Sequence, residues 1–328
     1  MKIKFGWKFW ITIIFGLIGY GFLFYALFYK TDIGYIAQTL NQIKWYYIFF
    51  GLLLGLLLIV IQGFFLKNIF ALYKIKLTLV ESIWTWLYTV PTGAVTAGLS
   101  GPAIIFYKAR RKNISFEFAT LITATYFIFY TASALLFIFL ISGSSFYHDF
   151  MEKPSYRFLD IFLLLLAILL LIFLFHRPSR IFIVNLFSKI TPKFFPKGES
   201  KKIIGLSNQA IFRIIISGFL ICLTNLSIFA LSFAVLRIGI SPFALFKNFA
   251  FYQIVSMFSP SGSGLGFVEL GLAGSLGLTG IDIGRASVVI VSFRAINFWF
   301  PAILGWLAIS FKGIDYLRDK VTKGDKEK

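Results

Sequence analysis

Apolar runs long enough to cross a lipid bilayer recur along almost the whole chain, and they constrain the fold more than any other feature. Each run holds about 20 residues, the number that an α-helix needs to cross roughly 30 Å of hydrocarbon. The chain has 328 residues, of which 59% are hydrophobic and only 14% are charged, and its mean hydropathy is +0.85. A soluble domain of this size needs more polar surface. The sequence therefore predicts an all-α, polytopic integral membrane protein.

Charge and the few reactive side chains narrow the class of function. The net charge of +19 comes from basic residues that flank the apolar runs, as expected for orientation in the membrane and contact with anionic lipid headgroups. We therefore expect membrane phospholipids, and no nucleic acid, as partners. Cys222 is the single cysteine, which excludes an intramolecular disulfide. His148 and His176 lie far apart at segment ends, so we expect no metal site, catalytic triad or cofactor.

The basic clusters also predict the topology. Positive loops usually stay in the cytoplasm, which places both termini there and the whole chain 1–328 in one membrane domain with a basic tail at 313–328. Run 9–29 is too long for a signal peptide and is read as an uncleaved first helix. About six full spans are predicted: 9–29, 45–66, 116–142, 158–175, 214–236 and 286–311.

Two segments rich in Pro and Gly do not fit as single crossings. Residues 78–107 lie between two cytoplasmic clusters, and residues 243–279 lie between two outer loops. We predict two re-entrant helical hairpins that enter from opposite sides, as in transporters built from an inverted repeat. The halves would be 1–157 and 158–312, although they share no obvious sequence identity. The alternative is that each broken segment makes two full crossings.

The breaks in these hairpins suggest a binding site. Irregular backbone inside a membrane must be buried in protein or line a wet cavity, and glycine lets the backbone approach a ligand closely. A helix that restarts near Gly266 would point free N–H groups at the break and favour an anion such as phosphate. The candidate binding residues at the two breaks are Gly93, Gly98 and Gly101, and Ser261, Gly262, Ser263, Gly264 and Gly266.

Two charges deep in apolar sequence are the other candidates. Glu269 is expected in the first turn of the restarted helix, either as a simple cap or as a group that binds a headgroup or carries a proton. Arg294 either pairs with Glu269 or directs its guanidinium at a lipid phosphate, and both arrangements fit different states of a transport cycle. Asn297 either adds donors to this site or joins helices. Gly51 and Gly55 form a GxxxG pattern that predicts close helix packing.

The stretch PSGSGLGFVELGLAGSLGLTGI, followed by SFRAINFWFPAILGWLAI, resembles the lysylphosphatidylglycerol synthase transmembrane region, also called the flippase-like domain family. Its members carry Pro-x-Gly-Gly-x-Gly-x-x-Glu, then an Arg in a final span that ends in Pro and Gly. Residues 260–269 match with a one-residue spacing shift, and Arg294, Pro301 and Gly305 match the later part. The earlier TGAVTAGLSGPAIIFYKARRKNISFEFA resembles the family's Gly-rich first motif. Two departures are Ser263, where a glycine is common, and ITATYFIFYTAS, where the family often has a charged pair.

The resemblance implies a flippase or transporter that moves phosphate-bearing, including aminoacylated, lipids between the leaflets of a prokaryotic cell membrane. Full-length synthases also carry a cytoplasmic domain that transfers lysine from lysyl-tRNA to phosphatidylglycerol. We expect no such domain after Lys312 and no aminoacyl transfer by this chain alone. The alternatives are a membrane-embedded component of a phosphatidylglycerol lysyltransferase and a non-catalytic scaffold for a separate lipid-modifying enzyme.

Overall fold

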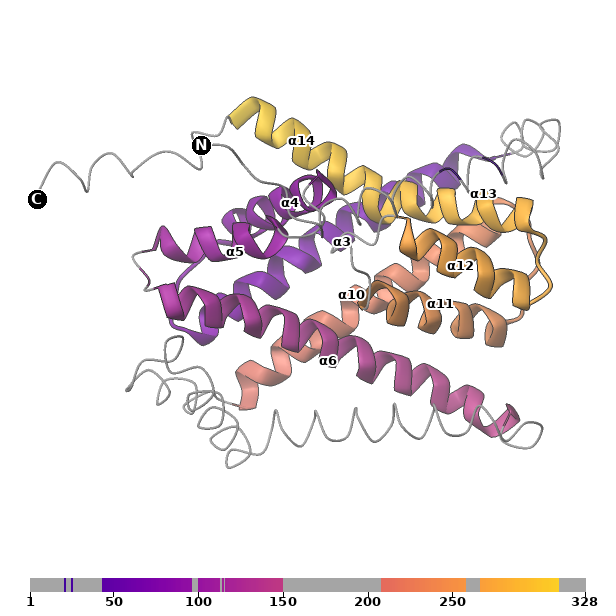
Figure 1. The fold of residues 1–328 in the computed structure, drawn as a ribbon, viewed down its shortest axis with the longest axis horizontal. Coiled ribbons are helices and arrows are strands. Elements are labelled where there is room, and N and C mark those ends of the chain that lie inside the picture. The colour runs from indigo at the N-terminus through magenta and orange to yellow at the C-terminus, as the bar shows by residue number, and fades with distance from the viewer. Residues whose placement is uncertain are drawn as a thin grey trace, which may run out of the picture.

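The computed structural model describes residues 21, 25, 43–95, 100–112, 114, 116–149, 208–257 and 266–312. Helices form all of the regular structure in these ranges, as predicted (Figure 1). The elements are α3 (Trp45–Leu72), α4 (Leu79–Val95), α5 (Ser100–Arg110), α6 (Phe116–Asp149), α10 (Asn208–Val235), α11 (Pro242–Met257), α12 (Phe267–Leu278), α13 (Ile283–Arg294), the π-helical turn η2 (Ala295–Trp299) and α14 (Phe300–Lys312).

Four helical stretches are long and apolar enough to cross a membrane. They coincide with four of the six predicted spans, whereas run 9–29 (apart from residues 21 and 25), run 158–175 and the tail 313–328 lie outside the described residues. Their apolar outer faces are suited to lipid: one side of α3, for example, exposes leucines and a valine at 41–49% of their surface. The protein is thus a multi-pass α-helical membrane protein, with spans at Trp45–Leu72, Ala119–Ile141, Asn208–Val235 and Ile283–Phe311.

The two Pro/Gly-broken segments form helix pairs. Glu81, near the start of α4, contacts Lys108 in the last turn of α5 and Lys112 just after it, so these helices fold back on one another. In the second pair, Asn248 of α11 accepts a hydrogen bond from Ser275 near the end of α12. At about 1.5 Å per residue, the 11 residues of α5 and the 12 of α12 span about 16 and 18 Å, well below the roughly 30 Å of a bilayer core.

Helices α3 and α10 form the centre of the molecule (Figure 1). Gly51 of α3 faces Leu231 of α10, and Phe65 of α3 faces Gly218, so the two helices run antiparallel. The GxxxG pair of α3 receives side chains of the last span: a Cβ on Gly55 would lie 2.8 Å from Cδ1 of Phe300. The close packing predicted from this pattern is therefore confirmed.

The segments α3–α6 and α10–α14 repeat the same order: a long helix, a helix pair and a second long helix. Corresponding positions make corresponding contacts. Gly55 is the eleventh residue of α3 and Gly218 the eleventh of α10. The side chain of Phe300 lies against Gly55, and the side chain of Ser133 lies against Gly218. Phe300 is the eighteenth residue of the last span, counted from Ile283 at the start of α13, and Ser133 is the eighteenth residue of α6. The two segments thus share one architecture despite their different sequences.

Each helix pair packs against the last long helix of the other segment. Helix α4 lies against α14, and α11 lies against α6. At the first of these contacts Gly305 meets the backbone carbonyl of Leu87, which a Cβ at position 305 would overlap. In a regular helix the carbonyl of Leu87 would accept a hydrogen bond from the backbone N–H of residue 91, but Pro91 has no N–H. The glycine therefore brings α14 against a stretch of α4 whose helical hydrogen bonding is interrupted.

Candidate functional site

A cavity of about 350 Å³ lies where the two helix pairs meet. Gly93 and Pro102 of the first pair and Ser256 and Val268 of the second line the same space, so both pairs point toward the centre (Figure 1). Polar side chains of α3, α6, α10, α11 and η2 complete its wall, and Arg294 is the one charged residue among the described lining residues. These side chains are Gln62, Tyr126, Tyr130, Asn225, Tyr252 and Asn297.

The polar lining comes in matched positions. Gln62 is the eighteenth residue of α3 and Asn225 the eighteenth of α10, so each segment contributes a carboxamide from its first long helix. Thr89 and Tyr252 are the eleventh residues of α4 and α11, and both line the cavity. The cavity therefore lies where the two similar segments face one another, and its polar character is built from both.

Glu269 and Arg294 form a buried ion pair beside this cavity. Arg294 Nε donates to Glu269 Oε1 at 2.6 Å, and the two side chains are 6% and 0% exposed. The guanidinium also lies 4.5 Å from the centre of the Phe298 ring, within range of a cation–π contact. Of the two arrangements expected for Arg294, the structure contains the pairing with Glu269. Arg294 lines the cavity, whereas Glu269 is fully buried.

The position of Glu269 follows from the backbone that precedes it. Gly266 has φ 79° and ψ −47°, a conformation that other residues rarely adopt, and α12 begins at Phe267. Glu269 therefore lies in the first turn, where its charge complements the positive end of the helix dipole as well as Arg294. The predictions that a helix restarts near Gly266 and that Glu269 lies in its first turn are confirmed.

The last span contains a π-helical turn that sequence reasoning did not predict. The turn covers Ala295–Trp299, directly after Arg294, and Pro301 follows one residue into α14. Proline removes one helical hydrogen bond and its ring crowds the carbonyl four residues earlier, which is that of Asn297. The wider turn accommodates this, and it places Asn297 so that Nδ2 donates to the hydroxyl of Tyr252 at 3.1 Å. The expected span 286–311 thus begins at Ile283 and is irregular at its centre.

Two carboxamide oxygens at the cavity have no hydrogen-bond partner within the described ranges. They are Oδ1 of Asn225 and Oδ1 of Asn297. Asn225 is only 5% exposed and lines the cavity. An unpaired buried acceptor costs about 1–3 kcal/mol, and both oxygens are buried, so a ligand in the cavity would contact them only if these side chains turned toward it. The signal for Asn225 and Gln62 was present in the sequence as single amides inside apolar runs, but only the fold shows that they meet.

The other predicted site residues have varied outcomes. Gly93 lines the cavity, and Gly101 lies in the first turn of α5. Gly98 and the serines and glycines Ser261, Gly262, Ser263 and Gly264 lie outside the described residues, so their predicted role stays a prediction. In the described ranges, no cluster of three or more His, Cys, Asp or Glu side chains could hold a metal ion.

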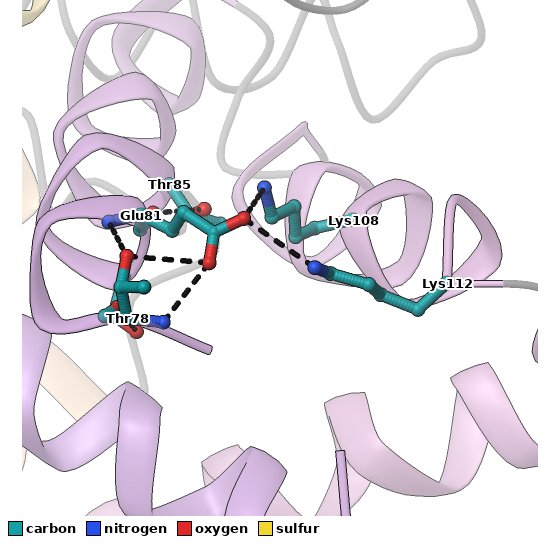
Figure 2. Close-up of polar contacts among 6 residues, drawn as sticks. Thr78, Glu81, Thr85, Lys108 and Lys112 are labelled. Atoms are coloured by element: carbon teal, nitrogen blue, oxygen red, sulfur yellow. Dashed lines mark hydrogen bonds and ion pairs between the residues drawn. The ribbon is translucent and has the colours of Figure 1, made fainter. Parts of the chain in front are cut away.

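A second polar cluster closes the base of the α4–α5 pair (Figure 2). Glu81 Oε1 lies 3.5 Å from Lys108 Nζ and 3.4 Å from Lys112 Nζ, and Oε2 accepts from the backbone N–H of Thr78 at 2.9 Å. Partial burial alone would raise the pKa of Glu81, but the Thr78 hydrogen bond and the two lysines outweigh it and lower this pKa. Thr78 Oγ1 accepts in turn from the N–H of Glu81, which completes a capping box at the start of α4.

Comparison with known families agrees with this architecture. The family described as Lysylphosphatidylglycerol synthase TM region matches residues 11–305, which include nearly all of the described helices. No curated protein matches the chain. The match covers most of the chain, and the chain therefore belongs to the lysylphosphatidylglycerol synthase transmembrane family, whose name ties it to membrane lipids.

Proposed function

We propose that this protein is a flippase or transporter that moves a phosphate-bearing lipid between the two leaflets, and that the central cavity holds the lipid headgroup. The observation that carries this proposal is a cavity of about 350 Å³ deep among membrane-spanning helices, with Arg294 as the one charge in its described lining. A space of this size is within the range of small-ligand sites. A purely structural membrane protein has no need of a polar space at that depth.

The helix arrangement supports transport over simple binding. The repeated order of helices, with α3 antiparallel to α10, favours an inverted repeat in which α4–α5 and α11–α12 are re-entrant hairpins from opposite sides. The shortness of α5 and α12 agrees with this reading. Residues from both pairs line one cavity, so a headgroup bound there would contact elements that reach each face. This is the geometry that alternating access requires.

The wall offers complementary chemistry for a lipid such as phosphatidylglycerol or its aminoacylated form. A guanidinium binds phosphate through a planar fork of N–H donors, and Arg294 presents this group at the cavity. The carboxamides of Asn225 and Asn297 line the same wall and would hydrogen-bond hydroxyl or ammonium groups of the headgroup once their side chains turn toward it. In the transport cycle, the phosphate and Glu269 would compete for the guanidinium of Arg294, which pairs with Glu269 in this structure.

The test is lipid movement in proteoliposomes that contain only this chain and headgroup-labelled phosphatidylglycerol. Arg294→Lys should slow movement about tenfold, or about 1.4 kcal/mol, because an ammonium does not reproduce the fork. Arg285→Lys is the matched control, since Arg285 pairs with Asp282 at an exposed site, where its side chain is 55% exposed. An inactive wild-type protein would refute transport. Lysine transfer from lysyl-tRNA by the purified chain would favour the enzyme, and the absence of both activities would favour a scaffold.

A further inference from the structure

A second hollow lies on the side of the molecule, between α5 and α6. Its volume is about 510 Å³ and its wall is almost entirely apolar. The hydroxyl of Thr123 adds little polarity, because Oγ1 donates to the carbonyl of Ala119 at 2.9 Å. Helix α6 is one of the four spans, and Ala103, Ala124 and Phe127 are exposed along the groove. The groove therefore opens toward the hydrocarbon of the membrane.

This lateral groove adjoins the central cavity. Pro102 and Phe127 line both spaces, so they form the partition between the apolar groove outside and the polar cavity inside. A diacyl phospholipid has the same division, with a polar headgroup joined to apolar chains. The two spaces together present, side by side, the two environments that one such molecule requires.

The repeated architecture gives this partition a counterpart in the second segment. Pro102 is the third residue of α5, and Glu269 is the third of α12. Phe127 is the twelfth residue of α6, and Arg294 is the twelfth of α13. We call the contact between two neighbouring helices a seam. The α12–α13 seam contains a buried ion pair of 2.6 Å at the positions where the α5–α6 seam has a proline and a phenylalanine. The α12–α13 seam is therefore joined by an ion pair, whereas the α5–α6 seam is apolar and borders a groove.

We propose that the α5–α6 seam is the lateral portal of the protein, and that the groove binds the acyl chains of a membrane phospholipid while its headgroup occupies the central cavity. The α12–α13 seam stays closed in the same state because separating it would leave two unpaired charges in a low-dielectric environment. Phe127 is the gating side chain, since it stands between groove and cavity and is partly exposed to lipid. This inference rests on the proposed function for the headgroup but makes a separate claim about the chains.

The experiment uses proteoliposomes with phosphatidylglycerol that carries a photoactivatable diazirine in one acyl chain, followed by mass spectrometry of labelled peptides. Labelling should concentrate on residues 100–112 and 116–149. Ala124→Trp puts an indole into the groove and should lower both this labelling and lipid movement at least about tenfold, because the chain and the indole compete for one space. Leu140→Trp, at a position of α6 that is 51% exposed and outside the groove, should change neither.

The outcomes separate the two proposals. Labelling centred on α12 and α13, or labelling of α5 and α6 that Ala124→Trp leaves unchanged, would overturn the portal even where lipid movement is normal. Groove labelling that Ala124→Trp removes, in a wild-type protein that moves no lipid, would uphold the acyl-chain site and refute transport. Circular dichroism and gel filtration of both tryptophan variants verify that each is folded.

Discussion

The buried pair of Glu269 and Arg294 allows a quantitative prediction. At the observed 2.6 Å, two unit charges in a medium of effective dielectric constant about 20 attract one another by about 6 kcal/mol. The desolvation of both groups offsets much of this gain, because the side chains are 6% and 0% exposed. Removal of either partner is different, since the remaining charge stays buried without its counter-ion. Glu269→Gln and Arg294→Gln should therefore each destabilise the fold by about 3–5 kcal/mol.

The double variant Glu269→Gln/Arg294→Gln distinguishes a true pair from two independent charges. It buries no net charge, so its loss of stability should be well below the sum of the two single losses. Thermal unfolding in detergent, followed through the fluorescence of the seven tryptophans, should show each single variant lower in Tm by roughly 4–7 °C. Additive losses, or single variants with the wild-type Tm, would contradict the reasoning.

Three further predictions concern packing, the hairpin base and topology. Gly305→Ala should destabilise the protein by about 1–3 kcal/mol, because the added Cβ would overlap the backbone carbonyl of Leu87. The control Gly274→Ala has open space around the added Cβ and should stabilise helix α12 by about 0.5–1 kcal/mol. Equal melting temperatures of the two variants would disprove this packing argument. Glu81→Gln should cost about 1 kcal/mol or less at neutral pH. The pKa of Glu81 is lower in the folded protein than in the unfolded chain. The stabilisation is therefore fully present at a pH above the ordinary pKa of glutamate and is lost as the pH falls through the pKa of the folded protein. The melting temperatures of the wild type and of Glu81→Gln should accordingly converge in acid. A membrane-impermeant maleimide should label Lys112→Cys from the cytoplasmic side only and Arg285→Cys from the outer side only, and labelling of both from one side would rule out the inverted arrangement.

The broken segments could be predicted because their signals are local. Proline and closely spaced glycines interrupt a helix whatever surrounds it, and basic clusters on both sides of 78–107 indicate that the chain returns to the same face. Both helix pairs are present in the structure. Glycines at 51 and 55 likewise predicted close packing, since a missing side chain leaves room for a neighbour in any fold.

The partners of these local features could not be predicted in the same way. Arg294 had two plausible roles, and only the folded chain brings it to Glu269. Gln62 and Asn225 occupy matched positions in α3 and α10, but the surrounding sequences differ too much to align without the helices. The α5–α6 groove could not be predicted either, because its lining residues come from two helices whose contact only the fold shows. The sequence ITATYFIFYTAS showed that this stretch lacks charged residues, but not that a groove lies beside it.

The exchange of contacts between the two segments has a consequence for how the chain must assemble. Helix α4 is completed by α14, and α11 is completed by α6, so neither segment contains the full set of neighbours that its own helices need. During synthesis the first segment therefore enters the bilayer before α14 has been made, and α4 lacks this packing partner until the last helix is inserted. Two separately expressed halves should be degraded when made alone and should survive when made together.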